Sequence, residues 1–162
     1  FHDTIYVLLM EYNMNKIKFL VFSICIFISG NVLSAEHVVK MLSNLKGQSM
    51  VFEPPVLTIN PGDSVKWVAT NPGHNTASID GMLPQGANPW NGGINEELVV
   101  KFDKEGIYGY KCTPHYILGM AGFIVVGNAN SNLEAVKKAA NDAQSKFAMN
   151  KTRLSDYLEQ VK

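Results

Sequence analysis

Cysteine is scarce in this chain, which has 162 residues and two cysteines, Cys25 and Cys112. Small exported domains that depend on disulfides carry more cysteines at regular spacings, so that class of scaffold is excluded. Neither sign of charge is in excess, because 14 Lys and Arg residues balance 14 Asp and Glu residues. This neutral balance gives no argument for nucleic acid or a strongly charged membrane surface as the partner.

Hydrophobic runs long enough to span a membrane are also missing. Residues 19–29 (FLVFSICIFIS) form an 11-residue apolar run, whereas a membrane-spanning helix needs roughly 20 apolar residues. Basic residues precede the run, and the small residues Ser34 and Ala35 follow it, which is the pattern of a secretory signal. We therefore expect residues 14–35 to be a cleaved signal peptide, with an uncleaved membrane anchor as the alternative.

Two consequences follow from a signal that starts at Met14. Residues 1–13 begin without methionine and are expected to be an upstream extension that is not part of the fold. Export then leaves a single thiol, Cys112, in a compartment where paired thiols become disulfides. Such a thiol is buried and inert, paired with another chain, or bound to a metal, and its neighbours must decide.

The region after the signal is typical of short β-strands separated by turns. The turn sequences include residues 60–63 (NPGD) and 71–73 (NPG), and residues 81–95 are expected to be irregular. Many short strands without helical intervals predict an all-β sandwich or barrel. The expected strands are residues 37–42, 50–52, 56–59, 64–69, 74–79, 97–102, 107–111 and 122–126.

The pattern changes after Gly127. Ser131 and Glu134 have the spacing of a helix capping box, and apolar residues at near-helical spacing follow them. We expect two helices, joined near Asn141, in a tail of residues 128–162 that packs on the sandwich. The tail is interpreted as a stabilising element, with a cofactor or membrane role as the alternative.

Metal-binding residue types gather in residues 111–120 (KCTPHYILGM). Cys112, His115 and Met120 form a C-x2-H-x4-M pattern on an expected loop, and His74 lies upstream, after a turn and at the start of another expected strand. Each residue alone has an ordinary reading as a core or surface residue. Two imidazoles, a thiolate and a weak thioether together form the ligand set of an electron-transfer copper site. Zinc could use the same donors, but the general affinity order favours copper.

The motifs resemble those of pseudoazurins, a branch of the cupredoxin family of blue-copper proteins. The resemblance covers nearly the whole chain after the signal. Plastocyanins share the ligand spacing, but the helices expected after Met120 favour pseudoazurin. The resemblance rests on residues 50–54 (MVFEP), 60–63 (NPGD), 73–75 (GHN) and 112–116 (CTPHY).

The fold implied by the resemblance is all-β: an eight-stranded Greek-key cupredoxin β-sandwich over residues 36–127, followed by two C-terminal α-helices. The implied cofactor is one type 1 copper per chain. Its ligands would be His74, Cys112, His115 and Met120.

Further residues acquire roles around the metal through the same resemblance. The backbone N–H of Asn75 is expected to bond to the Cys112 sulfur and tune it. Pro114 has no N–H to offer, so the sulfur should accept fewer hydrogen bonds than in azurin-like sites. Met50 is expected near the exposed histidine, with an ordinary place at the edge of the core as the alternative.

The resemblance also implies that His115 emerges through an apolar patch where electrons enter and leave. Relatives often surround this patch with lysines that steer acidic partners, but here Pro72 and Asn91 stand at two such positions. A neutral chain therefore predicts weaker steering that depends less on salt. The expected docking residues are Lys46, Lys111, Pro84, Ile117 and Leu118.

The implied function is that of a monomeric periplasmic electron carrier and not an enzyme. Its transient partners would be denitrification reductases such as copper nitrite reductase, or c-type cytochromes, with no nucleic acid and no membrane after signal cleavage. Copper oxidases and reductases need a second, histidine-rich site, whereas the chain after the signal has only His37, His74 and His115. A copper storage or delivery protein could use the same ligands and is the alternative.

Overall fold

The structure is a computed structural model that describes residues 34–161. The expected extension and nearly all of the expected signal peptide fall in residues 1–33, outside the described residues, and both stay predictions. Within residues 34–161, no helix is long and apolar enough to cross a membrane.

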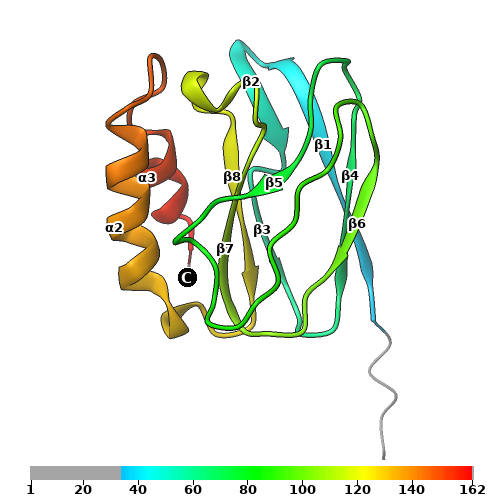
Figure 1. Ribbon diagram of the computed structural model, residues 1–162, viewed down its shortest axis with the longest axis vertical. Helices are drawn as coiled ribbons and strands as arrows, with labels where there is room; N and C mark the ends of the chain where they lie inside the picture. Colours follow the sequence, from blue (N-terminus) through cyan, green and yellow to red (C-terminus); the bar gives the residue numbers. More distant parts are fainter. Residues whose placement is uncertain (1–33, 162) are drawn as a thin grey trace, which may run out of the picture. The chain divides into compact units, whose positions relative to one another are not determined.

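Eight strands in the described residues form two four-stranded sheets (Figure 1). Strands β1 and β4 pair in parallel, as do β3 and β8, and the other pairs are antiparallel. The eight-stranded sandwich expected from the sequence is thereby confirmed. The first sheet has the order β2-β1-β4-β6, with bounds Gln48–Glu53, Glu36–Leu45, Ser64–Val68 and Leu98–Lys101. The second has the order β3-β8-β7-β5, with bounds Val56–Ile59, Ala121–Val126, Gly106–Lys111 and Ala77–Ser78.

A hydrophobic core fills the space between the two sheets. Along β4, Val65 and Trp67 are fully buried while the residues between and beside them are only partly buried, which is the alternation of a strand with one covered face. The Trp67 ring packs edge-on against Tyr110, with 5.2 Å between the ring centroids. Cys112 and Met120 belong to the same cluster, so the core extends to two of the expected metal ligands.

Strand β8 is buried along its whole length because it has a packed layer on each side. Ile124 and Val126 belong to the core between the sheets, whereas Phe123 and Val125 belong to a second core beneath the C-terminal helices. A strand covered on both faces becomes a continuous apolar run. This explains the sequence AGFIVV in β8.

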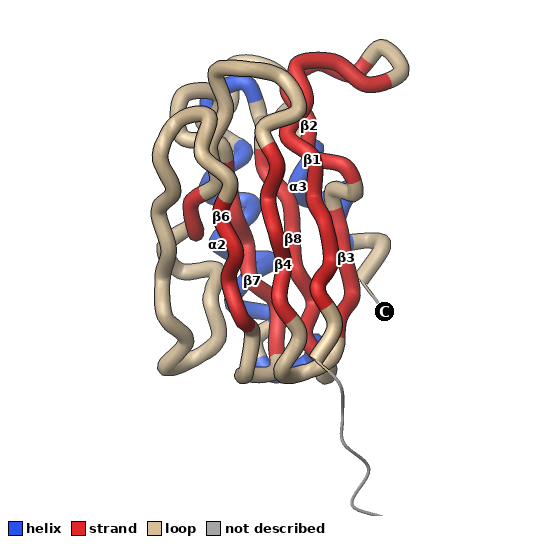
Figure 2. The backbone as a smooth tube through the Cα atoms, turned by 90° about the vertical axis from the view of Figure 1, so that its right-hand side faces the viewer, coloured by secondary structure: helices blue, strands red, loops and turns tan. Residues whose placement is uncertain are grey.

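Both expected helices are present, as α2 (Leu133–Gln144) and α3 (Arg153–Leu158), and they cover the outer face of the β7–β8 pair (Figure 2). The expected joint at Asn141 is wrong, because α2 carries this exposed residue within its last turn and continues to Gln144. The capping box is also wrong. Ser131 Oγ donates to the carbonyl of Glu105 at 3.2 Å, and no side chain caps the start of α2.

Two strands, β1 and β5, depart most from the sequence-based expectation near the predicted metal site. Strand β1 is longer than expected and joins β2 through a tight turn in which Lys46 and Gly47 both have positive φ, 50° and 85°. The strand expected over residues 74–79 contributes only Ala77 and Ser78 to the sheet. Residues before Ala77 make loop contacts instead, and these contacts belong to the site.

Candidate metal centre

The expected ligands come together at one end of the sandwich. Cys112 directly follows β7 and Met120 directly precedes β8, so the pairing of these strands fixes both ends of the ligand loop, residues 112–120. His115 precedes the short 3₁₀ helix η1 (Tyr116–Leu118) within this loop. His74 lies in the loop before β5, where its carbonyl accepts a hydrogen bond from a neighbouring loop at 2.8 Å.

Three donor atoms converge on one point. The Cys112 sulfur lies 3.6 Å from His74 Nδ1 and 3.4 Å from His115 Nδ1, and the two Nδ1 atoms are 3.2 Å apart. Metal–nitrogen bonds of roughly 2.0 Å and metal–sulfur bonds of roughly 2.3 Å place neighbouring donors of a near-tetrahedral site about 3.3–3.7 Å apart. The donors therefore have the chemistry and the spacing that a single metal ion requires.

The surroundings of the donors favour the uncharged form of both ligand types, the neutral imidazole and the protonated thiol. Burial lowers the pKa of His74, and the neighbouring His115 lowers it further, which favours the neutral imidazole. Burial raises the pKa of the Cys112 thiol, although the backbone N–H groups of Asn75 and His115 oppose this effect. A metal cation would bind the deprotonated thiol and neutral imidazoles, and Ser43 Oγ already lies 3.1 Å from the other ring nitrogen of His74.

Backbone hydrogen bonds fold the ligand loop onto itself. The Cys112 N–H donates to the Met120 carbonyl at 3.0 Å, and the Met120 N–H donates to the His115 carbonyl at 3.2 Å. The His115 N–H in turn donates to the Cys112 carbonyl at 3.2 Å. The three expected ligands of the loop are thus tied together through their backbones, and the Met120 side chain is fully buried.

Asn75 connects the His74 loop to the ligand loop. Its Oδ1 accepts from the Thr113 N–H at 2.7 Å, and its Nδ2 donates to Thr113 Oγ1 at 3.1 Å and to the Gly92 carbonyl at 2.9 Å. The backbone N–H of Asn75 acts to lower the pKa of the Cys112 thiol, and the bond to the sulfur that the resemblance implies stays a prediction. This residue is 4% exposed, so its side-chain bonds are shielded from water.

Pro114 and Met50, the other two residues expected around the ligands, lie in unlike environments. Pro114 is exposed within the ligand loop. Met50 is partly buried against the core cluster that contains Cys112 and Met120, and its φ of 51° lies in the left-handed region that non-glycine residues seldom adopt. Its carbonyl accepts a hydrogen bond from Arg153 Nη1 at 2.8 Å.

Four of the five expected docking residues are accessible, though not equally. Lys46 is exposed in the β1–β2 turn, and Ile117 is 52% exposed on η1 beside a half-buried Leu118. The Lys111 ammonium lies 4.9 Å from the centroid of the Tyr116 ring, in range of a cation–π contact.

The expectation for Pro84 is wrong. Pro84 is buried, and its Cγ lies 2.8 Å from the point that a Cβ on Gly106 would occupy. Gly106 begins β7, whereas His115 lies beyond the last residue of that strand. Pro84 therefore packs near the far end of the sandwich and belongs to no surface around His115.

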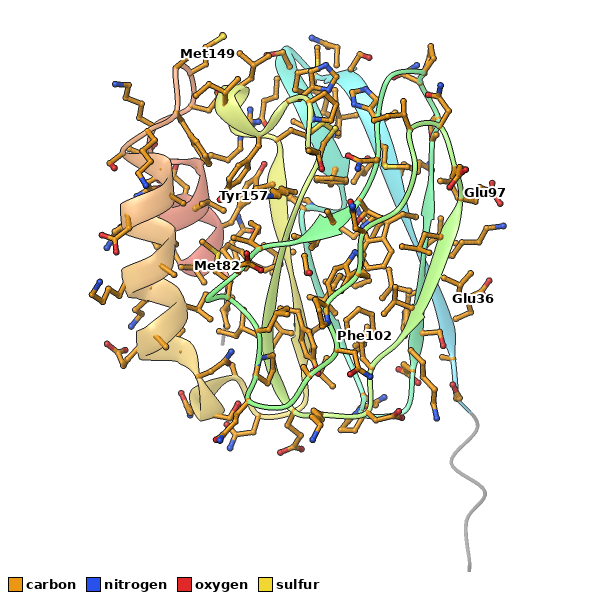
Figure 3. The ribbon with its side chains drawn as sticks, viewed as in Figure 1. Glu36, Met82, Glu97, Phe102, Met149 and Tyr157 are labelled. Carbon is orange, nitrogen blue, oxygen red and sulfur yellow. The ribbon has the colours of Figure 1, made fainter. Side chains whose placement is uncertain are left out.

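Sequence reasoning missed several residues at this end of the molecule. Met149, between α2 and α3, is 50% exposed and lies at the same end as the ligand loop (Figure 3). Ile94 is also 50% exposed, and the N–H of the next residue, Asn95, donates to the His74 carbonyl. Single apolar residues in loops, such as Met149 and Ile94, carry no periodic signal. Ser43 and Arg153 also contact the site, but they come from elements that are distant in sequence from their partners there.

Comparisons with known proteins agree with this geometry. The family model for copper binding proteins of the plastocyanin/azurin family matches residues 39–127. A pseudoazurin from Methylorubrum extorquens is 48% identical over 107 residues, which is 66% of this chain and 72% of the relative. A pseudoazurin from Paracoccus pantotrophus is 41% identical over 106 residues, 65% of this chain and 73% of the relative.

Solved structures give the same result. The crystal structure of pseudoazurin from Methylobacterium extorquens AM1 has a TM-score of 0.69 and 42% identity, covering 78% of this chain and 99% of that one. Native pseudoazurin from Hyphomicrobium denitrificans has a TM-score of 0.71 and 35% identity, covering 78% of this chain and 98% of that one.

Proposed function

The chain belongs to the plastocyanin/azurin family of copper-binding proteins, and from that premise we propose that it is a periplasmic one-electron carrier. The proposed ligands of its single type 1 copper are His74, Cys112, His115 and Met120. Residues 36–127 form the proposed copper-binding domain, and residues 128–162 the tail that stabilises it.

The convergence of one sulfur and two nitrogen atoms carries this proposal. The Cys112 sulfur and the Nδ1 atoms of His74 and His115 all lie within 4.8 Å of one another. A soft thiolate ligand together with two imidazole ligands suits copper in both of its common oxidation states. The buried Met120, tied by its backbone to the other two loop ligands, supports the thioether as the fourth ligand.

Copper supplies a one-electron Cu(II)/Cu(I) couple when it is bound. The protein holds the donors so that they move little when the charge of the site changes. Paired strands fix both ends of the ligand loop, and the buried Asn75 ties this loop to the segment that carries His74. Donors that need little rearrangement lower the barrier to electron transfer.

Electrons are proposed to enter and leave through His115. His74 is fully buried, whereas His115 is only partly buried in the loop that precedes η1. The half-exposed Ile117 and Met149, with the partly buried Leu118, supply apolar surface around that exit. A dry contact of this kind suits a transient redox complex, which needs close approach without high affinity.

The proposed partners are redox proteins with acidic docking surfaces, either c-type cytochromes or copper nitrite reductase. Lys46 and Lys111 lie at the copper end of the molecule and supply positive charge. Pro72 and Asn91 are exposed and uncharged, so attraction should be weaker than with a full lysine ring. We expect a monomer that reaches the periplasm through the signal peptide of residues 14–35.

Two other functions are less well supported. A second copper site built from histidines would need His37, but its Nε2 lies 3.0 Å from Asp63 Oδ2 near the start of β1. This contact argues against a copper enzyme contained in the chain. Copper storage or delivery stays the alternative, because the same donors could hold and release the ion.

Stopped-flow mixing of the reduced copper protein with an oxidised c-type cytochrome, or with copper nitrite reductase and nitrite, tests the proposal. We expect rapid oxidation of the carrier at a rate proportional to partner concentration, with copper retained through repeated cycles. Loss of copper on reduction, or no reaction with either partner, would favour delivery. Ile117→Lys should slow the reaction, whereas Val99→Lys, at a similarly exposed position on β6, should not.

A further inference from the structure

Three successive carbonyls of the ligand loop accept hydrogen bonds from one segment near the C-terminus. The Ala148 N–H donates to Ile117 at 2.8 Å, and Asn150 Nδ2 donates to Leu118 at 2.8 Å. Arg153 Nη1 donates to the third carbonyl, that of Gly119, at 3.0 Å. The last carbonyls of a helix lack partners within it, so this segment completes the end of η1 (Figure 1).

Arg153 differs from the other two donors because it carries a buried charge. It is 6% exposed, and its guanidinium bonds only to carbonyls: Gly119, Met50 at 2.8 Å and Ser49 at 3.2 Å. No carboxylate in residues 34–161 lies within ion-pair distance of it. A buried charge without an opposite charge costs stability. If Arg153 served only to hold the backbone in place, neutral donors could make the same hydrogen bonds at a lower cost in stability.

The contact with Gly119 fixes the peptide that leads into Met120. The carbonyl of this peptide accepts from Arg153, and its N–H, which belongs to Met120, donates to His115 at 3.2 Å. Both sides of one peptide plane are therefore bonded. Rotation of this plane would move the start of Met120, so the guanidinium restrains the backbone of the proposed thioether ligand.

The same guanidinium holds a second methionine backbone. The Met50 carbonyl belongs to a residue with a φ of 51°, a conformation that must be stabilised by its surroundings. The side chain of Met50 packs against the cluster that contains Cys112 and Met120. Arg153 thus joins the ligand loop to the β2 residue packed against it.

We propose that Arg153 is a positioning residue of the copper site: it restrains the Gly119–Met120 peptide and places a permanent positive charge beside the ligand loop. The proposal rests on the copper centre proposed above. A cation in a poorly screened position destabilises Cu(II) more than Cu(I), so Arg153 raises the reduction potential. Its geometric role appears in the metal–thioether interaction and therefore in the visible and electron paramagnetic resonance spectra.

Two substitutions separate charge from geometry. Arg153→Met keeps a long side chain but removes the charge and all donors, whereas Arg153→Lys keeps the charge without the planar fork. We expect Arg153→Met to lower the reduction potential and alter both spectra, and Arg153→Lys to alter the spectra with a smaller change in potential. Lys151→Met, an exposed lysine two residues away, should change neither.

Amide hydrogen exchange in the metal-free protein gives a readout independent of copper. The Met120 N–H should exchange roughly tenfold faster in Arg153→Met, as expected for the loss of about one hydrogen bond to a charged donor. Unchanged spectra, potential and Met120 exchange, with only a lower melting temperature, would overturn the proposal. If Arg153→Met does not fold, unchanged spectra and exchange in Arg153→Lys would overturn it.

The two proposals fail in different ways. A wild-type protein without a copper–thiolate band refutes the electron carrier but leaves the exchange experiment able to test the restraint on Met120. A blue wild-type protein whose spectra, reduction potential and Met120 exchange do not change when Arg153 is substituted refutes only the positioning role.

Discussion

Residues after Gly127 contact the start of strand β7 and also the ligand loop that follows this strand, but the two sets of contacts differ in kind. At the start of β7, Asn132 Oδ1 accepts from the Ile107 N–H at 2.8 Å and its Nδ2 donates to the Ile107 carbonyl at 2.9 Å. These neutral bonds continue the hydrogen bonding of a sheet. After β7, Arg153 and its neighbours hold a loop that carries proposed ligands.

The comparison teaches that one C-terminal tail serves two purposes. Its beginning covers backbone groups of β7 and should affect stability alone. Its segment around Arg153 should affect both stability and the properties of the metal, because within the described tail, residues 128–161, only that segment bonds to the ligand loop. Variants at the two ends therefore separate folding from redox function.

The largest effect is expected from Cys112→Ser at the copper end. A hydroxyl cannot replace the thiolate as a source of the thiolate-to-copper charge-transfer band, so the band should vanish completely. Absorption spectra of the copper-loaded variant measure this, and far-ultraviolet circular dichroism should show that the sandwich is retained. A persistent blue band would mean that the sulfur of Cys112 is not a ligand.

At the other end of β7, Asn132→Ala should cost stability and leave the copper site unchanged. The variant leaves the N–H and carbonyl of Ile107 without their partners, which should lower the free energy of unfolding by about 1–3 kcal/mol. Urea unfolding and the visible spectrum measure the two properties. Asn130→Ala, at a nearby exposed asparagine, is the matched control. A changed visible spectrum in Asn132→Ala would contradict the claim that the beginning of the tail affects stability alone.

Acid should weaken the molecule partly through Asp63, near the start of β1 and away from the ligand loop. Bonds from His37 and from the N–H groups of Ala35 and Asn60 lower the pKa of the Asp63 carboxyl. A lowered pKa stabilises the fold above the ordinary value of about 3.9, and this contribution disappears as pH falls through the folded-state value.

Urea unfolding of the metal-free wild type and Asp63→Asn between pH 2 and pH 7 tests that prediction. The wild type should be more stable near neutrality, and the difference should shrink in acid. A difference that stays constant across this range would show that the charge of Asp63 is not the cause. The visible spectrum of the copper-loaded variant at pH 7 should match the wild type.

The smallest effect is expected from surface charge. Lys46→Gln, in the exposed turn at the copper end, should slow electron transfer to an acidic partner by roughly two- to fivefold at low salt, with the difference lost at high salt. Lys104→Gln, an exposed lysine just before β7, should have no effect. Equal effects from both lysines would mean that net charge, and not docking at the copper end, controls the rate.

Much of the fold could be predicted because its patterns are local. The continuous apolar run of β8 and the alternation in β4 follow from which faces are covered. The candidate ligands Cys112, His115 and Met120 were visible because one loop between two strands carries three donor types. His74 joins them only through the fold, and it was assigned because a second imidazole completes the ligand set of an electron-transfer copper site.

The residues that sequence reasoning missed depend on contacts between distant segments. Pro84 lies in an irregular region without periodicity, so its burial beside Gly106 could not be foreseen. Arg153 reads as an ordinary charged residue at the start of a helix, yet the packing of α3 against β2 and the ligand loop buries it. Asn132 was overlooked because its partner is a strand residue and not the helix it precedes.

The visible absorption spectrum of the wild-type protein with one equivalent of Cu(II) tests the central claim most directly. The account predicts an intense thiolate-to-copper charge-transfer band that disappears on reduction and returns on oxidation, with copper retained throughout. A colourless protein that binds one Cu(II) while the Cys112 thiol stays reduced would contradict it.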